Sequence, residues 1–325
     1  MNIDLGQLTG LAGALGAAHS GGLVAALVER PGSAEELARR CSLDPRACAH
    51  VLDVLAAFGV ATREGDRYGA GDELAACNLS IERISTELWA HAPTFLRGGT
   101  PLITMDASVS EREGHYRDVV AELGRLFEAA ATELAARCGL RPRSILDVGC
   151  GSGVWSLALA QATPGARVTG LDLPAVLDRF VARASALGLA DRVDTIAGDM
   201  HAAALPDARW DVAIIANVLR LEPADRARAI VRRVASAVRS GGTVIIVDAL
   251  AAGTPEAERA RAIYAFHLAL RTRSGGVHRS AEIGRWLEEA GCGAPTLLPL
   301  GAGKCETAAL GAILASRGTR TPSPS

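Results

Sequence analysis

From about residue 143 onward, short apolar runs alternate with longer segments whose apolar positions recur every three or four residues. The apolar runs have the length of strands, and they are SILDV, ARVTGLD, RVDTIA, WDVAIIA and TVIIVD. The segments with helical spacing are VWSLALAQA, PAVLDRFVARASALGL and PADRARAIVRRVASAVRS. Strands that alternate with helices predict a parallel sheet covered on both faces. Ligands of such sheets bind beyond the carboxyl ends of the strands.

The chain up to about residue 140 is helical by pattern. Ser33 and Glu36 have the spacing of a capping box, Pro45 opens the next helix, and Gly59 ends it. The stretch VATREGDRYGA then alternates as a small hairpin. Helix, turn, helix and hairpin form the outline of a winged helix. A chain of 325 residues also favours more than one domain.

The winged-helix outline is compatible with DNA binding and with a module that dimerises. A helix that reads DNA presents cationic or amide side chains to the groove. The second helix offers Arg46 and His50 against Asp44 and Asp53, and it is otherwise apolar. This composition favours packing against another subunit.

Composition excludes several function classes. Apolar residues make up 49% of the chain and the formal net charge is -2, which argues against nucleic-acid or anionic membrane partners. The seven cysteines have neither a CxxC pair nor zinc-type spacing, which predicts a cytoplasmic protein without a metal site. The apolar N-terminal stretch lacks a basic region, so we expect neither a signal peptide nor a membrane span. A polar, Pro-containing tail at 317–325 predicts disorder.

A glycine-rich loop, GCGSG at residues 149–153, follows the first strand of the predicted sheet. It departs from the GxGxxG dinucleotide pattern because residue 154 is Val. Asp147 precedes the loop, Asp172 ends the second strand, and Asp199 with Met200 follows the third. Carboxylates there can accept hydrogen bonds from ribose hydroxyls and an adenine amino group, and a Met can pack on the ring. Three carboxylates at one sheet edge favour a neutral or cationic nucleoside over a pyrophosphate.

The motifs ILDVGCGSG, GLDLP, AGDM and RSGGTVIIVD resemble those of class I S-adenosyl-L-methionine-dependent methyltransferases. With the winged-helix outline, the chain resembles small-molecule O-methyltransferases of plant phenolic and bacterial secondary metabolism. The resemblance implies an α/β fold with a Rossmann-like seven-stranded sheet, helices on both faces and a mainly helical winged-helix domain before it. It also implies S-adenosylmethionine as cofactor, a small-molecule acceptor, and a homodimer formed through the N-terminal domain.

The resemblance also divides the chain and assigns residues. It implies a winged-helix-like dimerisation domain at 1–95, a helical linker with substrate-pocket helices at 96–140, and a methyltransferase domain at 141–316. Gly149 would lie against the methionine part of the cofactor, and Asp172 would hold its ribose. The expected cofactor-binding residues are Asp147, Gly149, Gly151, Gly153, Asp172, Leu173, Asp199, Met200, Ala216 and Asn217.

The chain departs from the family pattern at the position most important for catalysis. The family usually has a histidine after the fourth strand, which takes the proton from the acceptor hydroxyl. Alignment through Ala216 to Leu219 places Arg220 there, and a guanidinium does not accept a proton at neutral pH. Asp248, at the end of the fifth strand, falls where the family often has an acidic residue that orients the histidine.

Several interpretations of Arg220 remain open. Another histidine can be the base, with His267, His115 and His278 as candidates. Positioning alone can accelerate the displacement, while Arg220 lowers the pKa of a phenol or carboxyl acceptor. The acceptor can instead be a carbon or nitrogen atom. Arg220 can also form a plain salt bridge to Asp248 without a catalytic role.

Two further alternatives concern the whole chain. Some members of the resembling family bind the cofactor without methyl transfer and catalyse decarboxylation, hydroxylation or a pericyclic rearrangement. A ligand-sensing regulator with a winged helix is the alternative from another function class. The favoured prediction is methyl transfer to a hydroxyl of an aromatic or polyketide-derived molecule, with Arg220, His267 and Asp248 as catalytic candidates.

Overall fold

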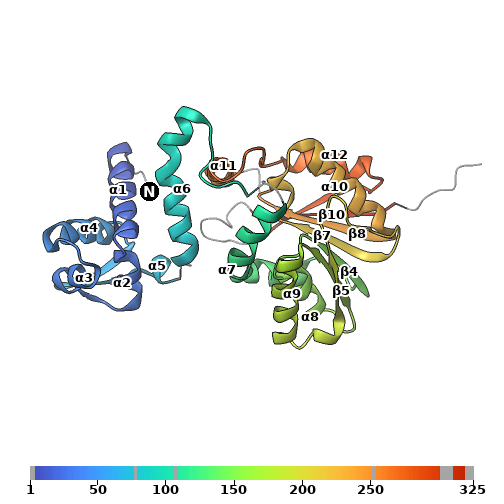
Figure 1. Cartoon of the computed structure of the whole chain (residues 1–325), viewed down its shortest axis with the longest axis horizontal. Coiled ribbons are helices and arrows are strands. Elements are labelled where there is room, and N and C mark those ends of the chain that lie inside the picture. Colours follow the sequence, from blue (N-terminus) through green and yellow to red (C-terminus); the bar gives the residue numbers. More distant parts are fainter. Residues whose placement is uncertain (1–3, 77–78, 106–108, 251–253, 301–309, 319–325) are drawn as a thin grey trace, which may run out of the picture. The chain divides into compact units, whose positions relative to one another are not determined.

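The computed structural model divides the chain into two compact units, Met1–Gly98 and Gly99–Ser325 (Figure 1). The helix α6 (Leu79–Gly98) extends through the end of the first unit, beyond the boundary expected at residue 95. The structure describes the backbone of residues 4–76, 79–105, 109–250, 254–300 and 310–318. Within these ranges, it does not describe the side chains of residues 80–82, 109–119 and 121–122.

The first unit has the element order of a winged helix. Its three short strands pair antiparallel in the order β1-β3-β2, so the predicted hairpin is confirmed and a third strand joins it. That third strand is only two residues long, which is too short to give a pattern. Before α6, the elements are α1 (Leu5–Ser20), α2 (Leu23–Glu29), β1 (Gly32–Ser33), α3 (Ala34–Cys41), α4 (Pro45–Ala57), β2 (Ala61–Glu64), β3 (Arg67–Ala70) and α5 (Asp72–Ala76).

Local sequence signals account for the starts of α3 and α4. The Ser33 hydroxyl accepts a hydrogen bond from the Glu36 amide at 3.2 Å, and the Glu36 carboxylate accepts one from the Ser33 amide at 3.1 Å. This is the predicted capping box. Pro45 occupies the first turn of α4, and the Asp44 carboxylate caps that helix by accepting from the Ala47 amide at 2.8 Å.

The second unit contains the predicted Rossmann-like sheet of seven strands, in the order β6-β5-β4-β7-β8-β10-β9. Strands β4 to β8 pair in parallel, whereas β10 runs antiparallel to both β8 and β9. The strands are β4 (Ser144–Val148), β5 (Arg167–Asp172), β6 (Val193–Ala197), β7 (Trp210–Ala216), β8 (Val238–Asp248), β9 (Thr296–Pro299) and β10 (Gly311–Ser316). The helices are α7 (Val109–Arg137), α8 (Val154–Gln161), α9 (Pro174–Ala186), α10 (Ala224–Ala237), α11 (Pro255–Ala269) and α12 (Ser280–Glu289), with short 3-10 turns η1 (Ala190–Arg192) and η2 (Leu219–Leu221).

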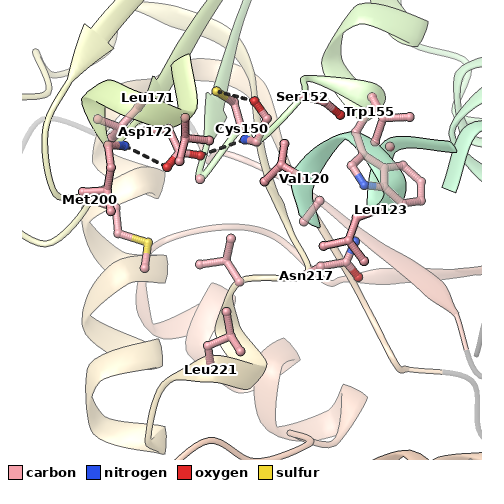
Figure 2. A pocket seen from close by; sticks show the side chains of 18 of the residues that line it. Val120, Leu123, Cys150, Ser152, Trp155, Leu171, Asp172, Met200, Asn217 and Leu221 are labelled. Carbon is pink, nitrogen blue, oxygen red and sulfur yellow. Dashed lines mark hydrogen bonds between the residues drawn. The ribbon is translucent and has the colours of Figure 1, made fainter. Parts of the chain in front are cut away.

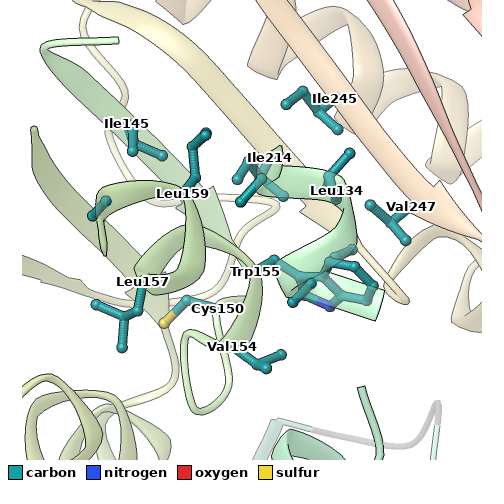
Figure 3. Close-up of a cluster of buried hydrophobic side chains, with 14 of the residues drawn as sticks. Leu134, Ile145, Cys150, Val154, Trp155, Leu157, Leu159, Ile214, Ile245 and Val247 are labelled. Carbon is teal, nitrogen blue, oxygen red and sulfur yellow. The ribbon is translucent and has the colours of Figure 1, made fainter. Parts of the chain in front are cut away.

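Helices cover both faces of this sheet, as predicted. Helices α7, α8 and α9 pack on one face, and α10 and α12 pack on the other. Figure 3 shows Leu134 of α7 and Leu157 of α8 in the same apolar cluster as Ile145, Ile214 and Val247 of the strands. Every residue of β7 is buried, which explains why its sequence is a continuous apolar run rather than an alternating one.

Helix α12 begins at a serine that does not cap it. Ser280 is the first helical residue, and Arg279 is the N-cap residue. The Arg279 carbonyl accepts the first helical hydrogen bonds, from Glu282 at 2.9 Å and Ile283 at 3.0 Å. Gly291 follows the helix with a left-handed φ of 80°, as expected for a helix stop.

Two predictions concern the ends of the chain, namely the absence of a membrane span near the N-terminus and a disordered C-terminal tail. In the part of the chain that the structure describes, no single helix is long and apolar enough to cross a membrane. The helices α1 and α2 meet the length and composition requirement only as a pair, which is bent by 76°. Residues 319–325 of the predicted disordered tail lie outside the described residues.

Candidate active site

A large cavity lies within the second unit, at the carboxyl ends of β4, β5, β6 and β7 (Figure 2). The strand order reverses at β4, which has β5 on one side and β7 on the other, and this is where doubly wound sheets bind ligands. The cavity encloses about 1200 Å³, including the space at its open mouth.

The glycine loop after β4 has a backbone that favours glycine. Gly149, Gly151 and Gly153 have left-handed φ angles of 67°, 55° and 71°. A Cβ atom on Gly149 would lie 2.6 Å from Cγ2 of Val218, and one on Gly153 would lie 2.5 Å from Cδ2 of Phe180. Gly149 and Gly151 line the cavity, whereas Gly153 faces the packed interior, against α9. The prediction placed all three against the cofactor.

Asp172 joins the end of β5 to the glycine loop. One carboxylate oxygen accepts a hydrogen bond from the Gly151 amide at 2.7 Å, and the other accepts one from the Leu173 amide at 2.7 Å (Figure 2). All three of these residues line the cavity. Each carboxylate oxygen has a second lone pair, so the group keeps the capacity to accept hydrogen bonds from a ligand.

The ends of β6 and β7 complete this wall. Asp199 and Met200 follow β6 and line the cavity, and the Asp199 carboxylate accepts from the His201 amide at 2.8 Å. Ala216 and Asn217, at the end of β7, also line it. The structure therefore brings the expected cofactor-binding residues together at one sheet edge, with two exceptions, Gly153 and Asp147.

Asp147 does not line the cavity. Its side chain is buried in the interior, where the Ser156 hydroxyl of α8 donates a hydrogen bond to it at 2.5 Å. Burial raises the pKa of Asp147 to about 7; the hydrogen bond from Ser156 opposes this rise and the negative charge of Asp172 adds to it. The carboxyl group thus joins β4 to α8, outside the cavity lining where a contact with the cofactor was expected.

Replacing Asp147 by asparagine should flatten the pH dependence of stability. The folded-state pKa of about 7 lies above the ordinary value of 3.8, so the folded protein binds this proton more tightly than the unfolded chain does. The unfolding free energy therefore falls as the pH rises through this interval, and the loss is complete above the folded-state pKa. At about 1.4 kcal/mol per pKa unit, the loss is roughly 4 kcal/mol.

Urea unfolding of the wild type and Asp147→Asn at about pH 5 and about pH 8 tests this prediction. The wild type should lose more unfolding free energy than Asp147→Asn between the two conditions. An equal loss in both proteins would show that the Asp147 carboxyl does not titrate in this range.

Arg220 lies in η2, after β7, and lines the cavity. Its guanidinium is 3.5 Å from the Asp248 carboxylate (Nη1 to Oδ1), and its backbone amide donates to Oδ2 at 3.3 Å. Asp248 is buried outside the cavity lining, and its Oδ1 also accepts from the Ala249 amide at 2.8 Å. The structure therefore contains the expected salt bridge and places its cation at the cavity wall.

The histidine candidates for a base have other environments. His267 is buried on α11, where burial and then the charge of Arg271 lower its pKa to about 3. The His278 ring Nε2 lies 3.0 Å and 3.1 Å from the backbone carbonyls of Leu219 and Glu222, to which it donates. The side chain of His115 is outside the described residues. Among the described side chains, no histidine lines the cavity.

A comparison with protein families decides the identity of this fold and cavity. The family model described as an O-methyltransferase domain matches residues 98–293, which is more than half of the chain. This chain belongs to the O-methyltransferase family. Members of the family are S-adenosylmethionine-dependent methyltransferases, so this protein is an enzyme of that type.

Individual O-methyltransferase relatives cover most of the chain. The 3-hydroxy-5-methyl-1-naphthoate 3-O-methyltransferase of Streptomyces sahachiroi is 27% identical over 86% of this chain and 85% of its own. The N,N-dimethyltransferase OxyT of Streptomyces rimosus is 28% identical over 70% and 71%, respectively. The structure of human N-acetylserotonin methyltransferase in complex with S-adenosylmethionine superposes with a TM-score of 0.70 at 18% identity, covering 97% of this chain and 95% of that one. This last similarity shows the shared fold.

The residues that line the cavity of this O-methyltransferase suit the chemistry of the family's cofactor. Gly149 and Gly151 line the cavity and have no Cβ atom, so a ligand can approach the loop backbone closely. The carboxylates of Asp172 and Asp199 supply acceptors at the ends of neighbouring strands. Within the described ranges, no three His, Cys, Asp or Glu side chains come together as a metal site.

The sequence reasoning missed several residues that line the cavity. Glu222 is two residues after Arg220, and its carboxylate lies 2.9 Å from the His201 ring. Arg271 follows α11 and is far from the loop in sequence. The sequence held one signal for Glu222, which is that it lies close to Arg220 along the chain. Only the folded path of the chain brings Arg271 to the cavity.

Proposed function

We propose that this O-methyltransferase methylates a hydroxyl group of an aromatic or polyketide-derived small molecule without a histidine base. The observation that carries the proposal is the cationic side chain of Arg220 at the cavity wall, held by Asp248, in a lining without a described histidine. The naphthoate O-methyltransferase relative supports an aromatic hydroxyl acceptor.

The cofactor is proposed to occupy the part of the cavity beside the glycine loop. Asp172 would accept hydrogen bonds from the ribose hydroxyls, while Asp199 would accept one from the adenine amino group and Met200 would pack on the ring. Gly149 would lie against the methionine part. When bound, S-adenosylmethionine supplies an electrophilic methyl group on a positively charged sulfur.

Arg220 is proposed to act on the acceptor through its charge. A nearby guanidinium favours the ionised form of a hydroxyl and lowers its pKa, so the acceptor can lose its proton to water before transfer. Asp248 holds the guanidinium in place through the contact of 3.5 Å. The rest of the acceleration would come from holding the acceptor oxygen in line with the methyl group.

Changing Arg220 should alter the pH dependence of the reaction. With an aromatic hydroxyl acceptor, Arg220→Met is expected to lower kcat near neutral pH by about 10–100-fold, because a favourable charge interaction of about 1.5–3 kcal/mol is lost. The pH–rate profile should shift to higher pH, and Arg220→Lys should restore part of the rate. Unchanged kcat and profile in Arg220→Met would reduce Arg220 to a structural salt bridge.

A nitrogen acceptor is the second candidate function. A neutral amine attacks without prior loss of a proton, so such a reaction does not need a histidine at the position of Arg220. The similarity to an N,N-dimethyltransferase favours this candidate. A rate that rises with the ionisation of a hydroxyl acceptor would separate the two candidates, because an amine acceptor has no such step.

We also propose that the first unit forms the interface of a homodimer. Leu5 and Leu8 on α1 are 79% and 50% exposed in the single chain, and Leu96 on α6 is 85% exposed. Leu5 and Leu8 are three residues apart on one helix and share a face, and adjoining exposed apolar side chains can mark a surface that packs against another subunit.

A further inference from the structure

Arg271 is the second arginine of the cavity wall. It follows the end of α11, and its carbonyl accepts a hydrogen bond from the Met105 amide at 2.9 Å. Both Arg271 and Met105 line the cavity. This backbone contact fixes the segment after α11, so the position of Arg271 is a feature of the fold.

A single tyrosine contacts both arginines of the wall. The Tyr264 hydroxyl accepts a hydrogen bond from Nη2 of Arg271 at 2.9 Å. The guanidinium carbons of Arg220 and Arg271 lie 4.9 Å and 5.5 Å from the centre of the Tyr264 ring. Cations at this distance from an aromatic ring are attracted to it. Tyr264 is buried, so it fixes two cationic groups beside one cavity.

The two arginines differ in how their charge is balanced. Arg220 has the carboxylate of Asp248 at 3.5 Å. Among the residues that the structure describes, Arg271 forms no ion pair with a carboxylate, and its Nε atom is buried without a hydrogen-bond partner. The neutral hydroxyl of Tyr264 does not compensate the charge of Arg271. Arg271 is half-buried and lines the cavity, so a guanidinium without a carboxylate partner stands where it can attract an anion.

The other charged residues of the lining are already engaged. Glu222 lies 2.9 Å from the His201 ring and 3.6 Å from the Arg226 guanidinium. Asp172 accepts backbone hydrogen bonds at the glycine loop, and Asp199 does so after β6. Arg271, which follows α11, is therefore the charged residue of the cavity wall that has no carboxylate partner among the described residues.

We propose that Arg271 binds a carboxylate of the acceptor, so that the substrates of this enzyme are aromatic hydroxy acids. The inference rests on the proposed function, because it assumes that the acceptor occupies this cavity. A planar guanidinium binds a carboxylate through two parallel hydrogen bonds, which fixes orientation as well as position. Arg271 would anchor the acid group while Arg220 acts at the hydroxyl that receives the methyl group.

The remaining lining suits the aromatic part of such a molecule. Phe127 and Trp155 line the cavity, with their ring centres 5.8 Å apart. Val120 and Leu123 of α7 add apolar surface near Trp155 (Figure 2). A mainly apolar wall with a few charged groups is the usual form of a site that orients a small molecule. The methionine carboxylate of the cofactor has the same chemistry as an acid group of the acceptor, so the test must separate them.

The test is equilibrium binding of two matched probes, 6-hydroxy-2-naphthoate and 2-naphthol, to the full-length enzyme saturated with S-adenosylhomocysteine. The probes differ only by the carboxylate, and calorimetry measures the dissociation constants without turnover. The variants are Arg271→Gln and Arg271→Lys. Arg273→Gln is the matched control, because it removes a positive charge two residues away at an exposed position outside the cavity lining.

The wild type should bind the naphthoate more tightly than the naphthol. Arg271→Gln should weaken naphthoate binding by about 10–100-fold, the loss of a charged hydrogen-bonded pair, and naphthol binding by less than about threefold. Arg271→Lys should restore part of the affinity, and Arg273→Gln should change neither probe.

Three results would overturn the inference. One is an equal loss for both probes in Arg271→Gln, and another is no preference of the wild type for the naphthoate. The third is a matching loss of S-adenosylhomocysteine affinity, which would assign Arg271 to the cofactor carboxylate. Arg271-dependent binding of the naphthoate without any methylation would support the inference and contradict only the proposed function.

Discussion

Replacing Asp172 by asparagine should weaken binding of S-adenosylmethionine by about 100–1000-fold. Both oxygens of the Asp172 carboxylate accept backbone hydrogen bonds, from Gly151 and Leu173, each at 2.7 Å. An asparagine has only one oxygen, so its amide nitrogen would face one of these N–H donors. The contact between the end of β5 and the glycine loop would then be repulsive at one of its two points.

The substitution also removes the negative charge that is proposed to hold the ribose. Hydrogen bonds to a charged group contribute about 1.5–3 kcal/mol each, and the change affects at least two of them. Titration calorimetry with S-adenosylhomocysteine measures the effect, and thermal unfolding checks that the variant is folded.

Asp194→Asn is a suitable control for Asp172→Asn. Asp194 lies on the neighbouring strand β6, where its exposed carboxylate pairs with Arg167 at 3.2 Å outside the cavity lining. The control should bind the cofactor like the wild type, because exposed pairs of this kind contribute about 0–1 kcal/mol. If Asp172→Asn loses less than about tenfold in affinity, the proposed ribose contact is wrong.

The substitution Gly153→Ala should lower the unfolding free energy by about 2–5 kcal/mol. The left-handed φ of 71° disfavours a side chain by about 1–2 kcal/mol. The new Cβ would also lie 2.5 Å and 2.7 Å from ring atoms of Phe180, which is fully buried. The ring has no room to move, and overpacking of this kind costs about 1–3 kcal/mol more.

Gly165→Ala isolates the backbone contribution. Gly165 has a φ of 80°, and a Cβ there would meet no atom within 4 Å. This control should lose only about 1–2 kcal/mol in urea unfolding. Equal losses in Gly153→Ala and Gly165→Ala would show that the contact with Phe180 has no effect on stability.

The sheet edge of the site was predictable from sequence because its signals are local. Parallel strands end at one edge of a sheet, so the residues that follow β4, β5 and β6 meet whatever the details of packing. Asp172 and Asp199 come together for this reason. The helix starts at Ser33 and Pro45 followed from hydrogen-bonding and backbone rules that act within a few residues.

Asp147 and Gly153 lie outside the cavity lining, which the sequence did not indicate because a motif does not show which way a side chain points. Successive residues of a strand face opposite sides, and Asp147 of β4 turns towards Ser156 of α8 rather than towards the cavity. Gly153 is required by the close approach of Phe180, a packing constraint that looks like a ligand constraint in the sequence.

The acceptor side of the site depends on contacts between distant segments. Arg271 is held at the cavity by its contact with Tyr264 and its backbone hydrogen bond to Met105, and neither contact has a sequence pattern. The chemistry at Arg220 was visible in the sequence because it departs from a family pattern. The structure adds that the Asp248 carboxylate lies 3.5 Å from the Arg220 guanidinium.

The most direct test of the central claim is the position of the methyl group in the product. The enzyme would be incubated with methyl-labelled S-adenosylmethionine and a panel of phenols, hydroxynaphthoates, arenes and amines, and the products would be identified by mass spectrometry. We predict label on a hydroxyl oxygen of an aromatic acceptor. Label found only on carbon or nitrogen, or tight cofactor binding without transfer to any member of the panel, would contradict this account.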